Sequence, residues 1–259
     1  MAVVVTALGK NKDKASTDPW TAFSSITLAT GDTLFLCLSY DYGAIPQTIQ
    51  WNSINKSAST LYSYNTGGVT VVIFHWPNVT GATGNVIIDW QTSYVPVAMA
   101  ATLYKATGLT ATPFDKSGTG ANSGTEQSAS TSANPTTAGD LAICVVGQEL
   151  HVDDTPGTWE SASNTVHENS QRDGTTGSGS SSNVTICTVA SLVDSAAAVE
   201  HGHLTTGDSG DWACAIATFQ QAAAAGPPGI KTINDLAIAS VKTINDLAIG
   251  SVKTLQDAA

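Results

Sequence analysis

Residues 30–40 read TGDTLFLCLSY and residues 138–146 read AGDLAICVV. In both stretches a Gly-Asp pair opens a mostly apolar run. In the first run Leu34, Leu36 and Leu38 recur at every second position, which places them on one face of an extended chain. We therefore predict that each stretch is a β-strand entered through a glycine turn.

Runs of the same kind continue along the first 225 residues, and amphipathic helical patterns are nearly absent. Thr-Gly, Ala-Gly, Gly-Gly and Pro-Gly pairs separate the runs, as turns between strands require. The chain is therefore predicted to be all-β. The further predicted strands are 69–74, 84–90, 97–104, 184–189 and 212–219.

The predicted strands form two related series. Gly139 follows Gly31 by 108 residues, and Trp159 follows Trp51 by the same interval. The interval later widens to 115 or 116 residues, which fits an insertion at the Ser/Gly-rich run 174–183. We predict two related halves, each supplying about four strands with one apolar face.

Two such apolar faces are buried most simply by packing against each other. We predict an antiparallel β-sandwich of jelly-roll-like type, with eight to ten strands in roughly 220 residues. Trp51 and Trp159 are expected to be equivalent core anchors near strand ends.

The cysteines and the first residues indicate the compartment of synthesis. The four cysteines lie inside apolar strand patterns without zinc-ligand spacing, so we predict buried free thiols at positions 37, 144, 187 and 214. The start, MAVVV, lacks the basic region of a signal peptide, and no stretch approaches the ~20 apolar residues of a membrane span. Synthesis in a reducing cytoplasm, with no membrane partner, is expected.

Charge is scarce and unevenly distributed. Charged residues make up 12% of the chain, and its formal net charge is −11. Three lysines and three aspartates cancel within residues 226–259, so residues 1–225 carry the whole excess. With a single arginine, Arg172, and no basic cluster, nucleic acid is not expected as a partner.

The C-terminal segment is repetitive. After Gly-Pro-Pro-Gly at 226–229 the chain reads IKTINDLAIAS, VKTINDLAIGS and VKTLQDAA. Because a unit this short cannot bury an apolar face alone, it must pack on its copies, on the body or on another molecule. We predict a β-sandwich domain over residues 1–225 and a hinge with an attachment tail over 226–259. The predicted partner-binding residues are Ile230, Ile233, Leu236, Ile238, Val241, Ile244, Leu247, Ile249, Val252 and Leu255.

The repeat allows two conformations. An 11-residue period fits a helix with about 3.67 residues per turn. The abundance of Ile, Thr and Val, with Asn-Asp at a turn position, favours short strands or a small solenoid-like stack. The extended alternative is preferred, and the helical one stays open.

One motif resembles that of a nucleophile. Gly-Asp-Ser-Gly at 207–210 matches most of the serine-protease pattern, which needs a histidine base oriented by a buried aspartate. Asp211 stands where a glycine commonly follows, and no Ala-Ala-His-Cys segment is present. We interpret the motif as a tight turn before the strand that begins at Trp212.

Two histidines suggest a metal site. His201 and His203 alternate and therefore share one face of a strand. The residues that could complete a His/Asp site with them are His151, Asp153, Asp154, His167 and Glu168. Asp153 with Asp154, or Asp208 with Asp211, could hold Ca²⁺ weakly, but EF-hand spacing is absent. We interpret these residues as polar loop edges and predict no metal or cofactor.

Cleavage or binding of glycans is the remaining functional alternative. Paired carboxylates would have to come from the five glutamates 126, 149, 160, 168 and 200. Aromatic residues that could form a sugar platform are Trp20, Tyr40, Tyr42, Trp51, Tyr62, Tyr64, Trp76, Trp90 and Tyr94. Such residues more often belong to the core. We predict that the protein is not an enzyme.

The body resembles a family of β-sandwich domains that recurs in bacteriophage virion proteins and in some secreted bacterial proteins. The resemblance covers most of residues 25–222 and implies no shared catalytic residues. It lies in Gly31-Asp32-Thr33-Leu34, Trp51, 103–109, Pro113-Phe114-Asp115, Ala138-Gly139-Asp140-Leu141 and 212–219. Leu103 and Lys105 stand where the family often has Glu and Ser. The tail is similar to IKxINGLAxAS repeats of phage structural proteins, with Asp235 and Asp246 in place of Gly.

These resemblances imply a structural virion protein of a tailed bacteriophage, made in the host cytoplasm. We expect a capsid decoration, or cement, protein whose tail contacts the major capsid protein or other virion subunits. A homo-oligomer is expected, with a trimer as the first candidate. The alternative is a tail-fibre or adhesin module that binds host-surface glycans through exposed Trp and Tyr, and a secreted glycan-active enzyme is the third hypothesis.

Overall fold

The computed structural model describes residues 2–13, 18–41, 46–56, 62–65, 68–91, 96, 98–149, 158–160, 171–174, 184–223, 232–233, 236–237, 243–244 and 247–248. The regular elements in these ranges are β-strands, and every pairing between them is antiparallel. None of the described residues forms a helix that could span a membrane. The predicted all-β, antiparallel sandwich is thereby confirmed.

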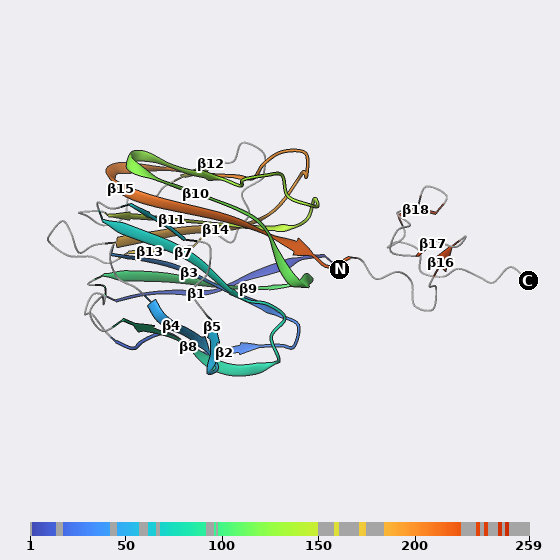
Figure 1. Ribbon diagram of the computed structural model, residues 1–259, viewed down its shortest axis with the longest axis horizontal. Helices are drawn as coiled ribbons and strands as arrows, with labels where there is room; N and C mark the ends of the chain where they lie inside the picture. Colours follow the sequence, from blue (N-terminus) through green and yellow to red (C-terminus); the bar gives the residue numbers. More distant parts are fainter. Residues whose placement is uncertain are drawn as a thin grey trace, which may run out of the picture.

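The first half of the chain forms two sheets (Figure 1). The first inner sheet has the order β1 (Val4–Asp13), β9 (Met99–Thr107), β3 (Thr33–Asp41), β7 (Val69–Trp76) and β6 (Tyr62–Asn65). The first outer sheet has the order β2 (Trp20–Leu28), β8 (Ala82–Trp90), β4 (Pro46–Trp51) and β5 (Ile54–Lys56).

The second half forms a longer sheet from five strands and a sixth that joins it. Its order is β10 (Leu109–Ser130), β15 (His201–Gln221), β11 (Leu141–Glu149), β14 (Val184–Leu192) and β13 (Gln171–Gly174), and β12 (Thr158–Glu160) pairs with the start of β15. We call the part made by residues 109–124, 210–221, β11, β14 and β13 the second inner sheet.

β10 and β15 are long because each passes from one layer to another. Their ladder breaks between the pairs Gly124–Gly210 and Glu126–Thr205, and beyond the break β10 turns back over itself. The backbone N–H of Ser132 donates to the Ser117 carbonyl at 2.9 Å. Residues 126–130, residues 201–205 and β12 therefore form a second outer sheet over the second inner sheet.

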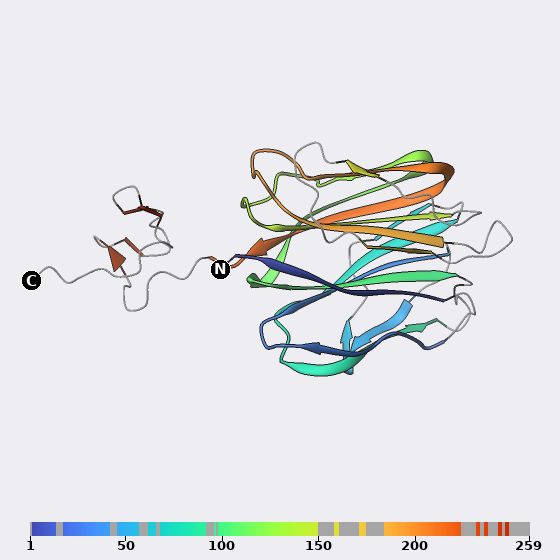
Figure 2. The ribbon, with the colours of Figure 1, turned by 180° about the vertical axis from the view of Figure 1, so that it is seen from behind.

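The two halves share one strand order. In the inner sheets, β1 corresponds to the first part of β10, β9 to the second part of β15, β3 to β11, β7 to β14 and β6 to β13. In the outer sheets, β2 corresponds to the end of β10, β8 to the start of β15 and β4 to β12. In each half the chain passes repeatedly between two sheets, as in a jelly roll, while β4 and β5, β6 and β7, and β13 and β14 pair within one sheet. Figures 1 and 2 show the resulting layers, from second outer through the two inner to first outer sheet.

The structure corrects the expected number of layers and strands. We expected one sheet from each half and eight to ten strands, whereas each half is itself a two-sheet roll and the body contains β1 to β15. The reason is visible in β3, which is buried on both faces. Leu36 faces the first outer sheet, while Phe35 and Cys37 pack against the second half. A strand covered on both sides needs two partner sheets.

The two inner sheets pack face to face around an apolar core that contains a small group of buried hydroxyl groups. The rings of Phe35 and Phe219 meet edge to face with centroids 4.7 Å apart. The Thr188 hydroxyl of the second half lies 2.7 Å from the Tyr104 hydroxyl and 3.0 Å from that of Thr102. These hydroxyl groups satisfy one another inside the interface, as buried polar groups require.

The Gly-Asp turns recur with the same hydrogen bonds in both halves. Gly31 and Gly139 have φ angles of +92° and +89°, a region that glycine enters without a steric penalty. In each turn the aspartate carboxylate accepts from the backbone N–H three residues earlier, and the glycine N–H donates to a valine carbonyl. The bonds are Ala29 N to Asp32 Oδ2, 2.9 Å; Gly31 N to Val79 O, 2.9 Å; Thr137 N to Asp140 Oδ2, 3.1 Å; and Gly139 N to Val193 O, 2.7 Å.

Replacing Phe219 with alanine tests the packing between the two inner sheets. Phe219 is fully buried, so Phe219→Ala should lower the free energy of unfolding by about 3–5 kcal/mol through lost contacts and a residual cavity. Chemical denaturation followed by tryptophan fluorescence measures the change. Val4→Ala, at a side chain that is 58% exposed, is the control and should change it by less than about 0.5 kcal/mol. Equal effects of the two substitutions would contradict the described interface.

Candidate functional site

The C-terminal repeats form two short hairpins with the same register. β16 (Thr232–Ile233) pairs with β17 (Leu236–Ala237), and β18 (Thr243–Ile244) pairs with β19 (Leu247–Ala248). In each hairpin the isoleucine is paired with the leucine and the threonine with the alanine. Figure 1 shows both hairpins beyond the end of the body at which the N-terminus lies.

Four of the predicted partner-binding residues lie in these strands: Ile233, Leu236, Ile244 and Leu247. The extended alternative for the tail therefore agrees with the structure at these positions, and the helical alternative does not. The remaining predicted residues, Ile230, Ile238, Val241, Ile249, Val252 and Leu255, lie outside the described residues. Whether any of the ten binds a partner stays a prediction.

A hairpin with two residues in each strand has few interactions of its own. Two-stranded hairpins are marginally stable in water, and independent stability needs a third strand or an apolar surface to pack on. The backbone groups on the outer edges of such a hairpin remain available to another strand. The repeats are therefore elements that gain stability when a neighbouring chain or surface covers them.

One polar cluster of the body lies on the second outer sheet. Ser130 Oγ and His201 Nδ1 are 2.6 Å apart, and His203 Nε2 and Glu126 Oε2 are also 2.6 Å apart. The Thr205 hydroxyl donates to the same Glu126 oxygen at 3.0 Å. Burial and the neighbouring His203 lower the pKa of His201. The cluster joins the two strands of this sheet across its polar face, where an exposed ion pair contributes little stability.

The histidines do not form the metal site considered as an alternative from the sequence with other described residues. Among the residues whose side chains the structure describes, no three His, Cys, Asp or Glu side chains are arranged to hold a metal ion. The further ligands considered from the sequence, His151, Asp153, Asp154, His167 and Glu168, lie outside the described residues. The described part of the cluster is a set of paired hydrogen bonds.

The Gly-Asp-Ser-Gly motif lies where β15 crosses from the second outer to the second inner sheet. The ladder with β10 is interrupted between Thr205 and Gly210, so the motif occupies the crossing. Ser209 is exposed, and Trp212, two residues after the motif, is buried on the inner sheet. A Cβ at Gly210 would approach the Glu149 carbonyl to 2.3 Å. Close packing at the crossing explains why glycine occupies position 210. We expected a tight turn at residues 207–210, but these residues are part of strand β15.

Most of the aromatic residues considered for a sugar platform are core residues. Trp20, Tyr40, Trp51, Trp76 and Trp90 are all at most 5% exposed and pack between the first inner and first outer sheets. Trp51 ends β4, as expected of a core anchor. Tyr42 and Tyr94 lie outside the described residues, as do the side chains of Tyr62, Tyr64 and Trp159. The five described rings are not available to bind a glycan.

Of the five glutamates, the structure describes the side chains of three in separate places. Glu126 belongs to the histidine cluster, Glu149 ends β11, and Glu200 is buried before β15. The Glu160 side chain and Glu168 lie outside the described residues.

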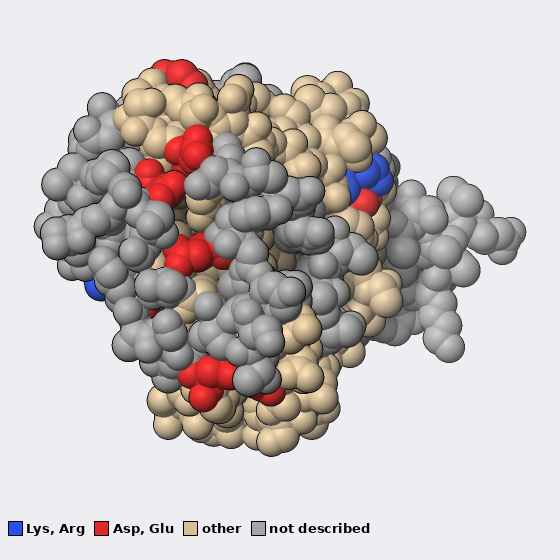
Figure 3. Space-filling model, turned by 60° about the vertical axis from the view of Figure 1, so that its left-hand side comes forward, with Lys and Arg blue, Asp and Glu red and all other residues tan. Residues whose placement is uncertain are grey.

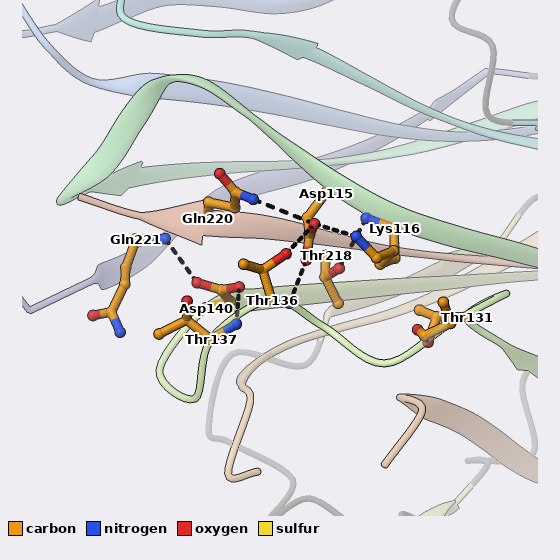
Figure 4. A network of polar contacts seen from close by, with 10 residues as sticks. Asp115, Lys116, Thr131, Thr136, Thr137, Asp140, Thr218, Gln220 and Gln221 are labelled. Carbon is orange, nitrogen blue, oxygen red and sulfur yellow. Dashed lines mark hydrogen bonds and ion pairs between the residues drawn. The ribbon is translucent and has the colours of Figure 1, made fainter. Parts of the chain in front are cut away.

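A second polar network, which the sequence did not indicate, surrounds Asp115 (Figure 4). Its carboxylate accepts hydrogen bonds from Lys116 Nζ at 2.6 Å, from the Thr136 backbone N–H and hydroxyl at 2.7 Å each, and from Gln220 Nε2 at 3.3 Å. Burial acts to raise the pKa of Asp115, but the hydrogen bonds from Lys116 and Thr136 outweigh it and lower that pKa. The network ties the loop after β10 to β15, which is a structural role.

Among the described residues, carboxylates predominate on the face of the body seen in Figure 3. The picture shows Asp and Glu side chains across this face, and the described Lys and Arg side chains that it shows lie at its margins. This agrees with the excess of negative charge in residues 1–225. Such a surface repels other copies of itself and other anionic surfaces.

Searches against family models, curated proteins and solved structures find no match to this chain.

Glu200 is a buried carboxyl group with an unusual proton affinity. It is 2% exposed, and no described residue forms a hydrogen bond with its Oε1. Its backbone N–H donates to the Thr131 hydroxyl at 3.0 Å, and its carbonyl accepts from the Thr131 N–H at 2.9 Å. Burial and the nearby Asp194 carboxylate raise the pKa of Glu200 to about 7. The folded protein therefore holds this proton more tightly than the unfolded chain does.

Glu200→Gln should remove a loss of stability that occurs as pH rises. The wild-type free energy of unfolding should fall between the ordinary carboxyl pKa of 4.5 and about pH 7, because the unfolded chain releases the proton first. At pH 8 the variant should be more stable than wild type by about 1–3 kcal/mol, allowing for partial solvation, and at pH 4.5 the two should differ little. Denaturant titrations at both pH values measure this. The exposed Glu126→Gln is the control, and a Glu200→Gln protein with wild-type pH dependence would contradict the assignment.

Proposed function

We propose that this protein is a structural component of a tailed bacteriophage particle, a decoration protein of the capsid exterior that attaches through its C-terminal repeats. One observation carries the proposal: two hairpins of identical register, built from one 11-residue repeat, lie beyond a body with covered inner sheets. The resemblance of body and tail to phage virion proteins supports the same assignment.

The body buries its own apolar surface. The faces of the two inner sheets are occupied by each other and by the outer sheets, in three apolar clusters. Four large hydrophobic residues are between 39% and 58% exposed among the described residues: Val4, Ile54, Phe114 and Val199. Scattered exposure of this kind needs no partner. The element that does need one is the tail.

The tail is suited to binding by strand addition. Among the described residues each hairpin is a sheet of two strands, and a partner strand could extend it in the manner of β-augmentation. Two equal hairpins on one chain bind a partner more tightly than one, because the second contact forms at high effective concentration. On a regular lattice, symmetric oligomers would multiply this effect, with a trimer as the first candidate.

The body and the tail differ in charge, and this difference suits different roles for them. The tail is neutral, with three lysines and three aspartates, whereas the body carries the formal −11. Neighbouring bodies repel one another, while the tail approaches a protein surface without this penalty. The proposed partner is the major capsid protein or another virion subunit, contacted by the tail with the bodies spaced apart outside it.

Deletion of residues 226–259 should separate folding from attachment. The truncated body should keep its thermal unfolding transition, because its cores lie within residues 2–223, but its copy number in purified particles should fall at least tenfold. Quantitative mass spectrometry of particles measures the copy number. A truncated chain incorporated at the wild-type level would refute the proposed attachment.

A paired substitution tests the hairpins themselves. Leu236→Asp with Leu247→Asp introduces a charge into each hairpin and should reduce incorporation nearly as much as the deletion, because burying an unpaired charge at an interface is costly. Thr232→Ser with Thr243→Ser in the partner strands is the matched control and should be incorporated normally. If the aspartate variant were incorporated like the serine variant, attachment would have to reside elsewhere in the chain.

A further inference from the structure

Three of the four cysteines lie in one buried layer. Cys144 on β11, Cys187 on β14 and Cys214 on β15 line the apolar cluster between the second inner and second outer sheets. Cys37 lies in a different cluster, between the two inner sheets. All four thiols are free and buried, as predicted.

Two of these thiols are in contact. Cys144 Sγ and Cys214 Sγ are 3.6 Å apart. Their strands are neighbours, and Cys144 is paired with Ile216 while Cys214 is paired with Val146, so the two cysteines are diagonal neighbours on one face of the sheet. Side chains in diagonal positions can reach each other across a ladder. A disulfide needs the sulfur atoms at about 2.05 Å and the Cα atoms within about 7 Å. Diagonal neighbours lie at about this limit, so closing the bond needs a small shift of the two strands as well as rotation of the side chains.

We propose that Cys144 and Cys214 are an oxidation site that small-molecule disulfides convert to an intramolecular disulfide. In the first step one cysteine thiolate attacks a sulfur of the reagent, forming a mixed disulfide and releasing one thiol. The second cysteine thiolate then attacks the protein sulfur of the mixed disulfide and releases the second thiol. The reagent gains two electrons, and the two protons of the cysteines end on the two released thiols.

The second outer sheet controls access to the pair. Gly202 lies directly over Cys144, and a Cβ at this glycine would be 2.3 Å from the sulfur. Hydrogen bonding with Cys214 and burial raise the pKa of the Cys144 thiol, so thiolate is scarce while the sheet is closed. The reaction therefore requires local opening of the layer formed by residues 126–130 and 201–205, and its rate reports that opening.

The disulfide between Cys144 and Cys214 would stabilise the second jelly roll. Cys144 and Cys214 are separated by 70 positions in the sequence, and the segment between them contains β12, β13 and β14. Closing this long loop restricts the unfolded chain and raises the stability of the half that contains it. A protein made in a reducing cytoplasm would thus gain a crosslink after release into oxidising surroundings. The inference stands on the geometry of the body and is independent of the proposed function.

The test is a thiol count on the folded, full-length protein. The protein is incubated at pH 8 with 2-hydroxyethyl disulfide, acid-quenched, alkylated in denaturant and digested, and its peptides are identified by mass spectrometry. We expect wild type to lose two of its four thiols and to give one crosslinked peptide pair containing Cys144 and Cys214. The melting temperature of the product should rise by about 5 °C or more and return on reduction.

Single cysteine substitutions identify which two cysteines form the disulfide. Cys144→Ala and Cys214→Ala should each abolish the crosslink, whereas Cys187→Ala and Cys37→Ala should retain it. Four alkylatable thiols after prolonged incubation would overturn the proposal, as would a crosslink to Cys187. The wild-type count decides the matter even if a variant fails to fold.

Discussion

The packing of the two inner sheets against each other is the contact on which the remaining architecture depends. Phe35 and Phe219 meet in this interface, and the backbone at Gly147 lies so close to side chains of the first inner sheet that a Cβ would be 2.4 Å from the Ser39 hydroxyl. Once each inner sheet has one face in this interface, its other face is also apolar and must be covered. The outer sheets, and the crossing of β10 and β15 between layers, follow from that requirement.

The strands that could be predicted from the sequence are those in which burial requires alternating or continuous apolar residues. β3, β7 and β8 lie within one or two residues of their expected positions, β14 extends three residues beyond its expected end, and the equivalence of the halves appears in the turns at Asp32 and Asp140. β10 was missed because its sequence, largely Ser, Gly, Thr and Ala, lacks alternating hydrophobicity. A strand at a sheet edge with a partly exposed face has the composition of a loop, and long-range pairing decides its conformation.

The polar clusters show a similar limit. The alternation of His201 and His203 placed both on one face, but their partners Ser130 and Glu126 are 71 and 77 residues away in sequence. Spacing along a chain carries no information about such partners. The tail was more accessible to prediction, because a repeated 11-residue phrase with a turn signal is a local pattern, and its strands pair within one repeat.

The order of the strands along the chain has a consequence for synthesis. β1 to β9 complete the first jelly roll by Thr107, whereas the second roll needs β15, which is the last strand of the body. Until β15 leaves the ribosome, roughly ten seconds after β9 at usual translation speeds, the apolar face of the first inner sheet lacks the partner that covers it in the complete fold. We therefore expect the emerging second half to cover this face as it is synthesised, while the net negative charge of the body disfavours contact between unfinished chains.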